Sequence, residues 1–132
     1  EFNLESFTCP HTYEADMRAK HDVPTWLYRY FGDWDNLRLY PNSSAYHGAD
    51  LHMIFGASED VSGLPDSDPQ RQTMALMMRA WAAFAENPRE GLRRELGWPE
   101  YDRRGTLSSA YAHSAEHDDI GGAWSTVRTL SA

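Results

Sequence analysis

The sequence predicts a mixed α and β fold, and it predicts that this chain is one part of a larger domain. Residues 68–87 show the apolar spacing of an amphipathic helix, and residues 23–31 are dense in the aromatic and β-branched residues typical of a strand. A strand must satisfy its backbone donors and acceptors on both edges, and no partner strand is predicted in the rest of the chain. The missing partner strands are therefore expected outside this chain.

The first part of the chain predicts an extended segment, a helix, a strand and a long loop. Residues 1–8 are extended, and Pro10 suits the first turn of a helix that continues to about His21. The strand 23–31 has Pro24 at its entry. Residues 32–46 are rich in Gly, Asp, Asn, Pro and Ser, which predicts a loop. Loops longer than ~12 residues in compact domains are usually functional or disordered.

The second part predicts a short helix over 48–55, a turn-rich segment over 57–67, and the amphipathic helix that starts at residue 68. In the short helix Leu51, Ile54 and Phe55 share one side. Asp68 is expected to cap the longer helix, with Pro69 in its first turn. Its apolar residues recur at spacings of three and four: Met74, Met77, Met78, Trp81 and Phe84. This spacing favours core packing over a soft-metal or promiscuous binding face. The remaining residues predict loop with short helical pieces.

Composition excludes several classes of function. The formal net charge is −8, and no basic run is present that could neutralise nucleic-acid phosphates. No apolar run approaches the ~18 to 20 residues of a membrane span. A neutral or cationic ligand fits this charge best. The single cysteine, Cys9, is either a buried thiol or half of a bridge to another chain. Asn42-Ser43-Ser44 is a glycosylation sequon, which matters on a secretory route only.

The segment Ser44-Ala45-Tyr46-His47-Gly48-Ala49-Asp50-Leu51 predicts a loop that delivers a catalytic histidine. A general base must meet both nucleophile and substrate, and loops on rigid scaffolds supply such residues. Spacing alone favours a simpler interpretation of His47, as a surface histidine at the start of a helix. Likewise, Asp50 fits either a local hydrogen bond or a carboxylate that acts near a site.

A family resemblance favours the catalytic interpretation of His47 over the surface one. The chain resembles the C-terminal portion of type-B carboxylesterases, the cholinesterase-like branch of the α/β-hydrolase fold. The segments that carry the resemblance agree in order and approximate spacing: Phe7-Thr8-Cys9-Pro10, Pro24 to Tyr30, Ala45 to Leu51, Ile54-Phe55-Gly56, the helix with Met78, Trp81, Ala82, Phe84 and Ala85, and Gly97 to Tyr101. They cover about residues 7–101, and residues 102–132 stay unassigned.

The resemblance implies that residues 1–132 are the C-terminal part of a single α/β-hydrolase domain. In such a domain helices flank a mixed, mostly parallel sheet, and this chain would contribute about one strand, the histidine loop and closing helices. His47 matches the triad histidine, which takes the proton of a serine hydroxyl and returns it to the leaving alcohol. Gly48 would allow a close backbone approach. Asp50 matches an acidic position that supports the site, and Tyr46 either lines the acyl or alcohol pocket or packs into the core.

The sequence lacks the rest of the catalytic machinery. It contains no Gly-x-Ser-x-Gly and no glycine-rich oxyanion segment, and the family's triad acid precedes the matched region. A larger N-terminal chain or segment is therefore expected to supply the serine, the acid and the oxyanion hole. The family cysteine that matches Cys9 can be bridged to one near the C-terminus, and no cysteine follows Cys9 here.

The expected function is hydrolysis of a small-molecule carboxylic ester, without cofactor or metal, by a secreted serine esterase or lipase. This chain alone is expected to be inactive. Two alternatives remain open: a non-catalytic binding or adhesion module of the same fold, and a truncated product without a stable fold. His113 and His117 have a spacing that can bind zinc on a helix, but their polar surroundings favour a solvated tail.

Overall fold

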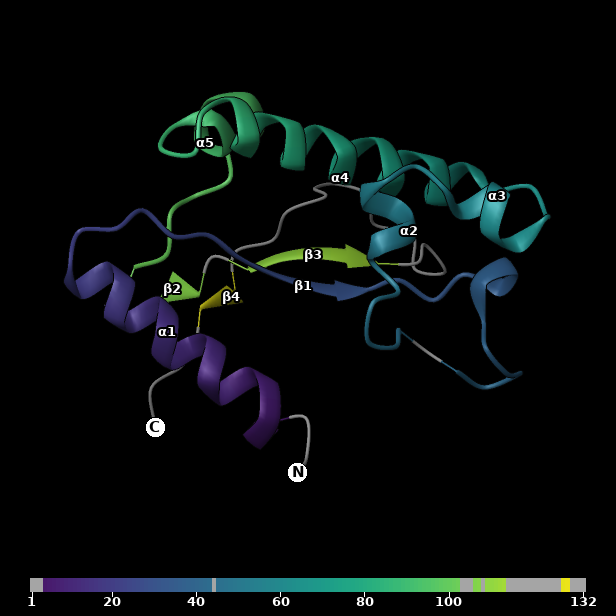
Figure 1. Ribbon diagram of the computed structural model, residues 1–132, viewed down its shortest axis with the longest axis horizontal. Helices are drawn as coiled ribbons and strands as arrows, with labels where there is room; N and C mark the ends of the chain where they lie inside the picture. Colours follow the sequence, from purple (N-terminus) through teal and green to yellow (C-terminus); the bar gives the residue numbers. More distant parts are fainter. Residues whose placement is uncertain (1–3, 44, 103–105, 108, 114–126, 129–132) are drawn as a thin grey trace.

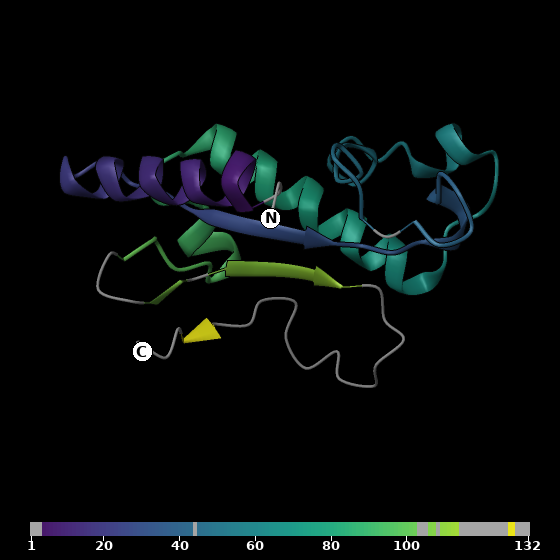
Figure 2. The same ribbon diagram turned by 90° about the horizontal axis from the view of Figure 1, so that it is seen from below.

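The computed structural model describes residues 4–43, 45–102, 106–107, 109–113 and 127–128. The elements in chain order are η1 (Leu4–Thr8), α1 (Cys9–Lys20), β1 (Leu27–Phe31), η2 (Asp35–Leu37), α2 (Leu51–Ile54), α3 (Ser58–Ser62), α4 (Asp68–Glu86), α5 (Gly91–Leu96), β2 (Thr106–Leu107), β3 (Ser109–His113) and β4 (Val127–Arg128). Figures 1 and 2 show α1 and α4 on opposite faces of the sheet that β1 and β3 form. The predicted mixture of helix and strand is therefore present, arranged in three layers.

The predicted strand finds one partner within the chain itself. β1 pairs in parallel with β3, from Leu27 opposite Ser109 to Phe31 opposite His113. A parallel pair needs a long crossover connection, and helices α2 to α5 lie within it. A separate antiparallel pair joins β2 to β4. The expectation of no partner strand in the chain was wrong, because the short, small-residue segment 109–113 has little strand signal of its own.

The strand begins later than predicted, at Leu27 instead of Val23. The backbone N–H of Val23 donates to the carbonyl of Arg18 at 3.0 Å, so this residue still closes the end of α1. Pro24 follows, and it has no backbone N–H to donate to a neighbouring strand. At Thr25 the backbone no longer bonds to α1: its carbonyl accepts a hydrogen bond from the N–H of Tyr101 at 2.8 Å.

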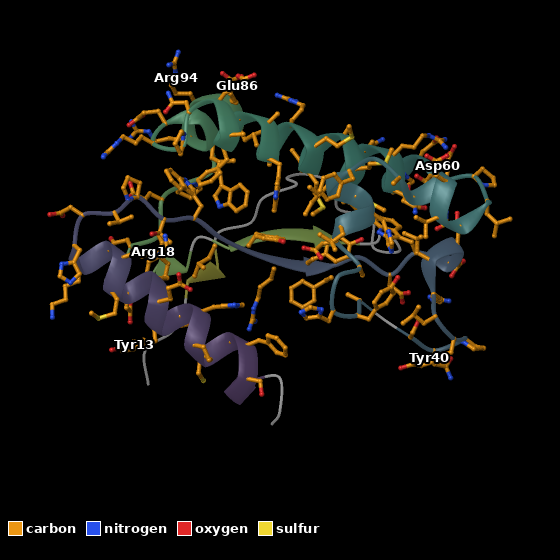
Figure 3. All side chains as sticks on the ribbon, in the orientation of Figure 1. Tyr13, Arg18, Tyr40, Asp60, Glu86 and Arg94 are labelled. Atoms are coloured by element: carbon orange, nitrogen blue, oxygen red, sulfur yellow. The ribbon has the colours of Figure 1, made fainter. Side chains whose placement is uncertain are left out.

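Helix α4 has the predicted range and a different cap. Ser67, not Asp68, is the N-cap: its hydroxyl accepts from the backbone N–H of Gln70, and the Gln70 side chain accepts from the N–H of Ser67. This reciprocal capping box satisfies two helix-end donors. The helix ends before Asn87, as predicted. Figure 3 shows Glu86 and, on α5, Arg94 pointing away from the sheet.

Two clusters of buried side chains lie between α4 and β1. One contains Trp34, Leu37, Met53 and Met77, and the other contains Ala80, Leu92 and Trp98. The methionine stripe packs into this core only in part, because Met77 is buried and Met78 is 43% exposed. Tyr28 and Trp81 pack against both clusters, with their rings edge-to-face at 5.0 Å between centroids.

Two further predictions need correction. The turn-rich segment 57–67 contains the helix α3, because the Ser58 hydroxyl donates to the carboxylate of Asp66 and anchors the turn around a buried contact. The helix predicted over 48–55 is shorter, and its buried residue is Met53, whereas Leu51 and Phe55 are exposed. Residues 32–43, together with 45 and 46, form the expected loop, which the short 3₁₀ helix η2 interrupts.

Candidate functional site

The turn that carries His47 precedes α2 and lies near the carboxyl ends of β1 and β3 (Figure 1). His47 is exposed, and its ring lies 5.5 Å from the ring of Phe7 between centroids, tilted by 46°. Phe7 comes from η1, so the start of the chain contacts the histidine loop. In open α/β sheets, ligand sites lie outside the carboxyl ends of strands. The position of His47 fits a group that acts on a partner or substrate approaching from solvent.

Backbone hydrogen bonds close this turn immediately after His47. The N–H of Ala49 donates to the carbonyl of Tyr46 at 3.0 Å, and the N–H of Leu51 donates to the carbonyl of Gly48 at 3.1 Å. Gly48 has a φ of 86°, in the left-handed region that favours glycine. A Cβ at Gly48 would meet only the side chain of Leu51, at 3.7 Å. Glycine is thus needed here for its φ angle, and the close backbone approach implied by the resemblance stays a prediction.

Asp50 is half-buried and accepts a hydrogen bond from the hydroxyl of Tyr28 on β1. Burial raises the pKa of Tyr28 above its usual range, and the Asp50 carboxylate adds to the rise. This bond ties the end of the histidine turn to the middle of the strand. The carboxylate of Asp50 therefore engages the scaffold, and within the described part of the chain it forms no hydrogen bond with His47.

Tyr46 is half-buried, and its hydroxyl lies 3.3 Å from Nε2 of His52. It lines a small recess with residues of the segment 30–38, among them Tyr30 and Trp34. The Trp34 indole N–H donates to the Tyr30 hydroxyl at 2.7 Å. Tyr46 thus packs beside the 30–38 segment and lies outside the larger cavity described below.

A second anchor holds the loop before His47. Asn36 donates from its amide to the carboxylate of Asp66 at 2.8 Å, and its carbonyl accepts from the Gln70 amide at 2.9 Å. Asp66 is 4% exposed and also accepts from the hydroxyl of Ser58, which is fully buried. This network joins the loop 32–46 to α3 and α4. Only Gln70 had a local signal in the sequence, its capping-box spacing; Asn36, Asp66 and Tyr28 act through contacts distant in sequence.

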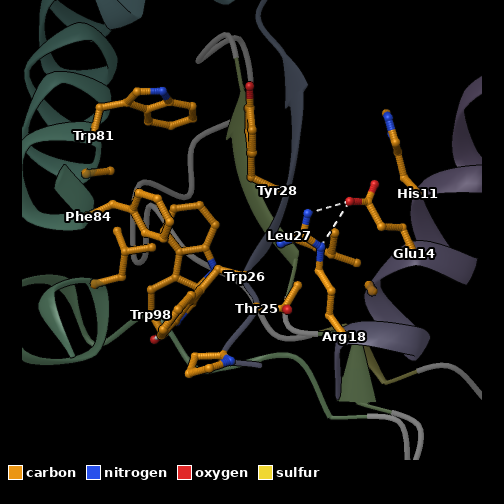
Figure 4. A pocket seen from close by; sticks show the side chains of 14 residues that line it. His11, Glu14, Arg18, Thr25, Trp26, Leu27, Tyr28, Trp81, Phe84 and Trp98 are labelled. Atoms are coloured by element: carbon orange, nitrogen blue, oxygen red, sulfur yellow. Dashed lines mark hydrogen bonds and ion pairs between the residues drawn. The ribbon is translucent and has the colours of Figure 1, made fainter. Parts of the chain in front are cut away.

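A cavity with a volume of about 330 Å³ lies beside β1, and its lining contains none of the predicted site residues. Figure 4 shows β1 between its two walls. Helix α1 forms one wall, and α4, α5 and Trp98 form the other. The lining side chains come from three parts of the fold. Helix α1 contributes Glu14, Ala15 and Arg18. The strand β1 and the residue before it contribute Trp26, Leu27 and Tyr28, and the wall opposite α1 contributes Trp81, Phe84 and Trp98. Arg18 and Glu14 form an ion pair at 2.6 Å.

The remaining candidate residues lie apart from this turn. Asn42 is exposed in a turn of the loop, while Ser44 of its sequon lies outside the described residues. Cys9 is free and exposed at the start of α1, so of its two interpretations the buried thiol is not met, and a bridge to another chain stays a prediction. His113 is the last residue of β3, not part of a helix, and His117 lies outside the described residues.

Within the part of the chain that the structure describes, no group of three or more His, Cys, Asp or Glu residues is placed to hold a metal ion. The helices of that part also fall short of what a bilayer requires. None combines the length and the apolar character needed to cross a membrane.

The sequence profile of the carboxylesterase family matches residues 3–120. The chain belongs to this family. Membership implies an α/β-hydrolase fold and agrees with the resemblance that the motifs indicated. Among curated proteins, the chain is 28% identical over 109 residues to "Secreted lipase 5" of Gibberella zeae, covering 83% of this chain and 20% of that protein. It is 30% identical over 83 residues to "Chlorogenic acid esterase" of Aspergillus niger, covering 63% of this chain and 16% of that protein.

The matched region of this carboxylesterase-family chain thus spans about a fifth of the length of one relative and about a sixth of the other. No solved structure matches the chain significantly.

Proposed function

We propose that this chain is the histidine-bearing, C-terminal part of a serine carboxylic-ester hydrolase. The observation that carries the proposal is the placement of His47: an exposed imidazole on a glycine-dependent turn at the carboxyl end of the sheet, within a family of esterases. Two relatives bear the names of a lipase and an esterase. The nucleophilic serine, the acid and the oxyanion hole belong to a larger portion that this chain completes.

In the proposed reaction, His47 accepts the proton of the serine hydroxyl as the serine oxygen attacks the ester carbonyl carbon. The C–O bond to the alcohol then breaks, and the imidazolium returns that proton to the leaving alkoxide. Water, deprotonated by the same imidazole, then attacks the acyl carbonyl carbon; the bond to the serine oxygen breaks, the imidazolium returns the proton to that oxygen, and the carboxylic acid is released. The chain alone has no nucleophile and is inactive.

The role proposed for Asp50 is structural support of the turn. Its carboxylate is engaged by the Tyr28 hydroxyl, so it fixes where the turn sits on β1 and adds negative potential near the imidazole. Gly48 supplies the φ angle that the turn requires. Tyr46 packs beside the turn, and we propose no direct substrate contact for it.

We also propose that the enzyme is secreted. One relative is named a secreted lipase, and Asn42 is exposed, as a glycan acceptor must be. Mass analysis of the chain from its native host, before and after enzymatic deglycosylation, tests this. A mass loss that maps to Asn42 supports a secretory route, and an unmodified Asn42 in protein recovered from inside the cell contradicts it.

The decisive test of the function is labelling with a fluorescent fluorophosphonate, which reacts with activated serines. The protein is purified from its native host, and each band of a denaturing gel is identified by mass. A labelled polypeptide that contains this chain, or that co-purifies with it, supports the esterase. Absence of label in folded material indicates the non-catalytic module, and absence of a cooperative melting transition indicates the truncated product.

A further inference from the structure

The turn that presents His47 is held by side chains on both sides of it. After His47, Asp50 accepts the hydrogen bond of Tyr28 and fixes the turn to β1. Before His47, Tyr46 places its hydroxyl 3.3 Å from Nε2 of His52. A hydroxyl and an imidazole nitrogen can bond in either tautomer, since the hydroxyl donates to a bare Nε2 and accepts from a protonated one. The residue next to the candidate base is thus bonded to a second histidine.

His52 lies in α2, and α2 is anchored in the core. The next residue, Met53, is fully buried and belongs to the cluster that also contains Trp34 and Leu37. The backbone carbonyl of His52 accepts from the N–H of Ala57 at 2.9 Å, so hydrogen bonding continues past the end of the helix. The half-buried imidazole of His52 is therefore presented by a fixed backbone.

Tyr46 also adjoins this core through the segment 30–38. Trp34 and Leu37 are buried, and both line the small recess that Tyr46 lines. The recess beside Tyr46 and the helix that carries His52 thus share one packed cluster. The carbonyl of Tyr46 accepts from the N–H of Ala49, which is 5% exposed. The side chain and the carbonyl of Tyr46 are both held, which leaves the backbone that leads into residue 47 little freedom.

This restraint matters for the chemistry of a general base. A base must lie within hydrogen-bond reach of the proton that it abstracts, and small displacements lower the rate sharply. Because His47 is exposed, the direction of its imidazole depends on the backbone of the turn. A side chain that holds Tyr46 therefore acts on the proton transfer without touching the substrate.

We propose that His52 is a positioning residue for the esterase reaction: it bonds the hydroxyl of Tyr46 and thereby fixes the backbone on the N-terminal side of His47. Its effect on catalysis rests on the proposed function. His52 does not accept the proton of the serine and does not contact the ester. A carboxamide can form the same hydrogen bond with a hydroxyl, but it cannot act as a general base. Glutamine at position 52 therefore separates positioning from proton transfer.

Steady-state kinetics of the complete enzyme with a chromogenic ester test the proposal. His52→Ala removes one neutral hydrogen bond that acts on the transition state, so we expect kcat to fall about three- to tenfold and KM to change less than about twofold. His52→Gln should restore kcat to within about twofold of the parent. His21→Ala, which removes an exposed histidine at the end of α1, is the matched control and should leave both constants unchanged.

A double-mutant cycle tests whether the two side chains act as a pair. Tyr46→Phe combined with His52→Ala should lower kcat no more than either substitution alone. Additive losses would overturn the proposal, as would an unchanged kcat in His52→Ala or a loss that glutamine does not restore. A loss of several orders of magnitude, equal to that of His47→Ala, would make His52 the base and would also overturn it.

Hydrogen exchange reports on the turn itself and separates this proposal from the proposed function. The amides of Ala49 and Leu51, which close the turn, should exchange about fivefold faster in His52→Ala and at parental rates in His52→Gln, while those of α4 stay unchanged. That result in material that fluorophosphonate does not label would keep the positioning contact and reject catalysis. Labelling that depends on His47, with equal exchange in parent and variant, would keep catalysis and reject the contact.

Discussion

The hydroxyl of Tyr28 donates a hydrogen bond to the carboxylate of Asp50, and this contact joins the middle of β1 to the turn that presents His47. The two residues are 22 positions apart in sequence. On the loop side, Asn36 is bonded to Asp66 and Gln70. Asp50, after His47, thus fixes the turn to β1, and Asn36, before His47, fixes the loop to α4, while His47 itself stays exposed.

Replacing Tyr28 with Phe removes the hydroxyl and leaves the ring packing in place. A hydrogen bond to a charged group contributes about 1.5 to 3 kcal/mol, so we expect the free energy of unfolding to fall by an amount in that range. Urea denaturation followed by tryptophan fluorescence measures it. Tyr40→Phe is the control, because Tyr40 is 63% exposed, and equal effects of the two substitutions would mean that the Asp50 contact contributes nothing.

Alkaline pH should destabilise the protein through its buried tyrosines. Burial raises the pKa of Tyr30 from 10.0 to about 12, and burial together with Asp50 raises that of Tyr28 further. As the pH rises, the unfolded chain therefore releases the tyrosine protons first. Between the ordinary and the raised pKa, the native state binds more protons than the unfolded state does. The free energy of unfolding should be unaffected by these groups below their ordinary pKa and should fall as the pH rises from 10 toward 12.

Urea midpoints measured across that interval check this expectation. The Tyr30→Phe variant should lose less stability with rising pH than the parent does. An identical pH dependence in both proteins would show that Tyr30 ionises alike in the folded and unfolded states.

His47→Ala in the complete enzyme should reduce kcat/KM for an ester substrate by several orders of magnitude, because the serine loses its general base. His21→Ala is the control, since His21 is exposed at the end of α1. Initial rates with a chromogenic ester measure both. Turnover of the His47 variant within about tenfold of the parent would reject the catalytic assignment.

Asp66→Ala should destabilise the fold more than any surface substitution. Asp66 is 4% exposed, and its loss leaves the buried hydroxyl of Ser58 and the half-buried amide of Asn36 without this acceptor. Each unsatisfied buried donor costs about 1 to 3 kcal/mol, so a total loss of about 3 kcal/mol is expected. Asp60→Ala on the exposed side of α3 is the matched control (Figure 3). Chemical denaturation that gives the same midpoint for both variants would contradict the role of this network.

Local patterns in the sequence determined the two longest helices, α1 and α4, and the position of the histidine turn. The spacing of apolar residues predicts α4 because an amphipathic helix reveals its buried face within a few residues, and Pro10 and the residues after it predict α1 in the same way. The segment around His47, taken together with the other motifs in order between about residues 7 and 101, was enough to identify the carboxylesterase family, which the family profile then confirmed.

Tertiary structure alone decided the rest. The pairing of β1 with the segment 109–113, the bond from Tyr28 to Asp50, and the cavity between α1 and α4 each join residues far apart along the chain. No local pattern encodes such a contact, because its free energy comes from burial and hydrogen bonding that arise only after the chain has folded. That is why Ser109–His113 carried no strand signal, and why Asp50, which fits a local role by spacing, bonds to a strand instead.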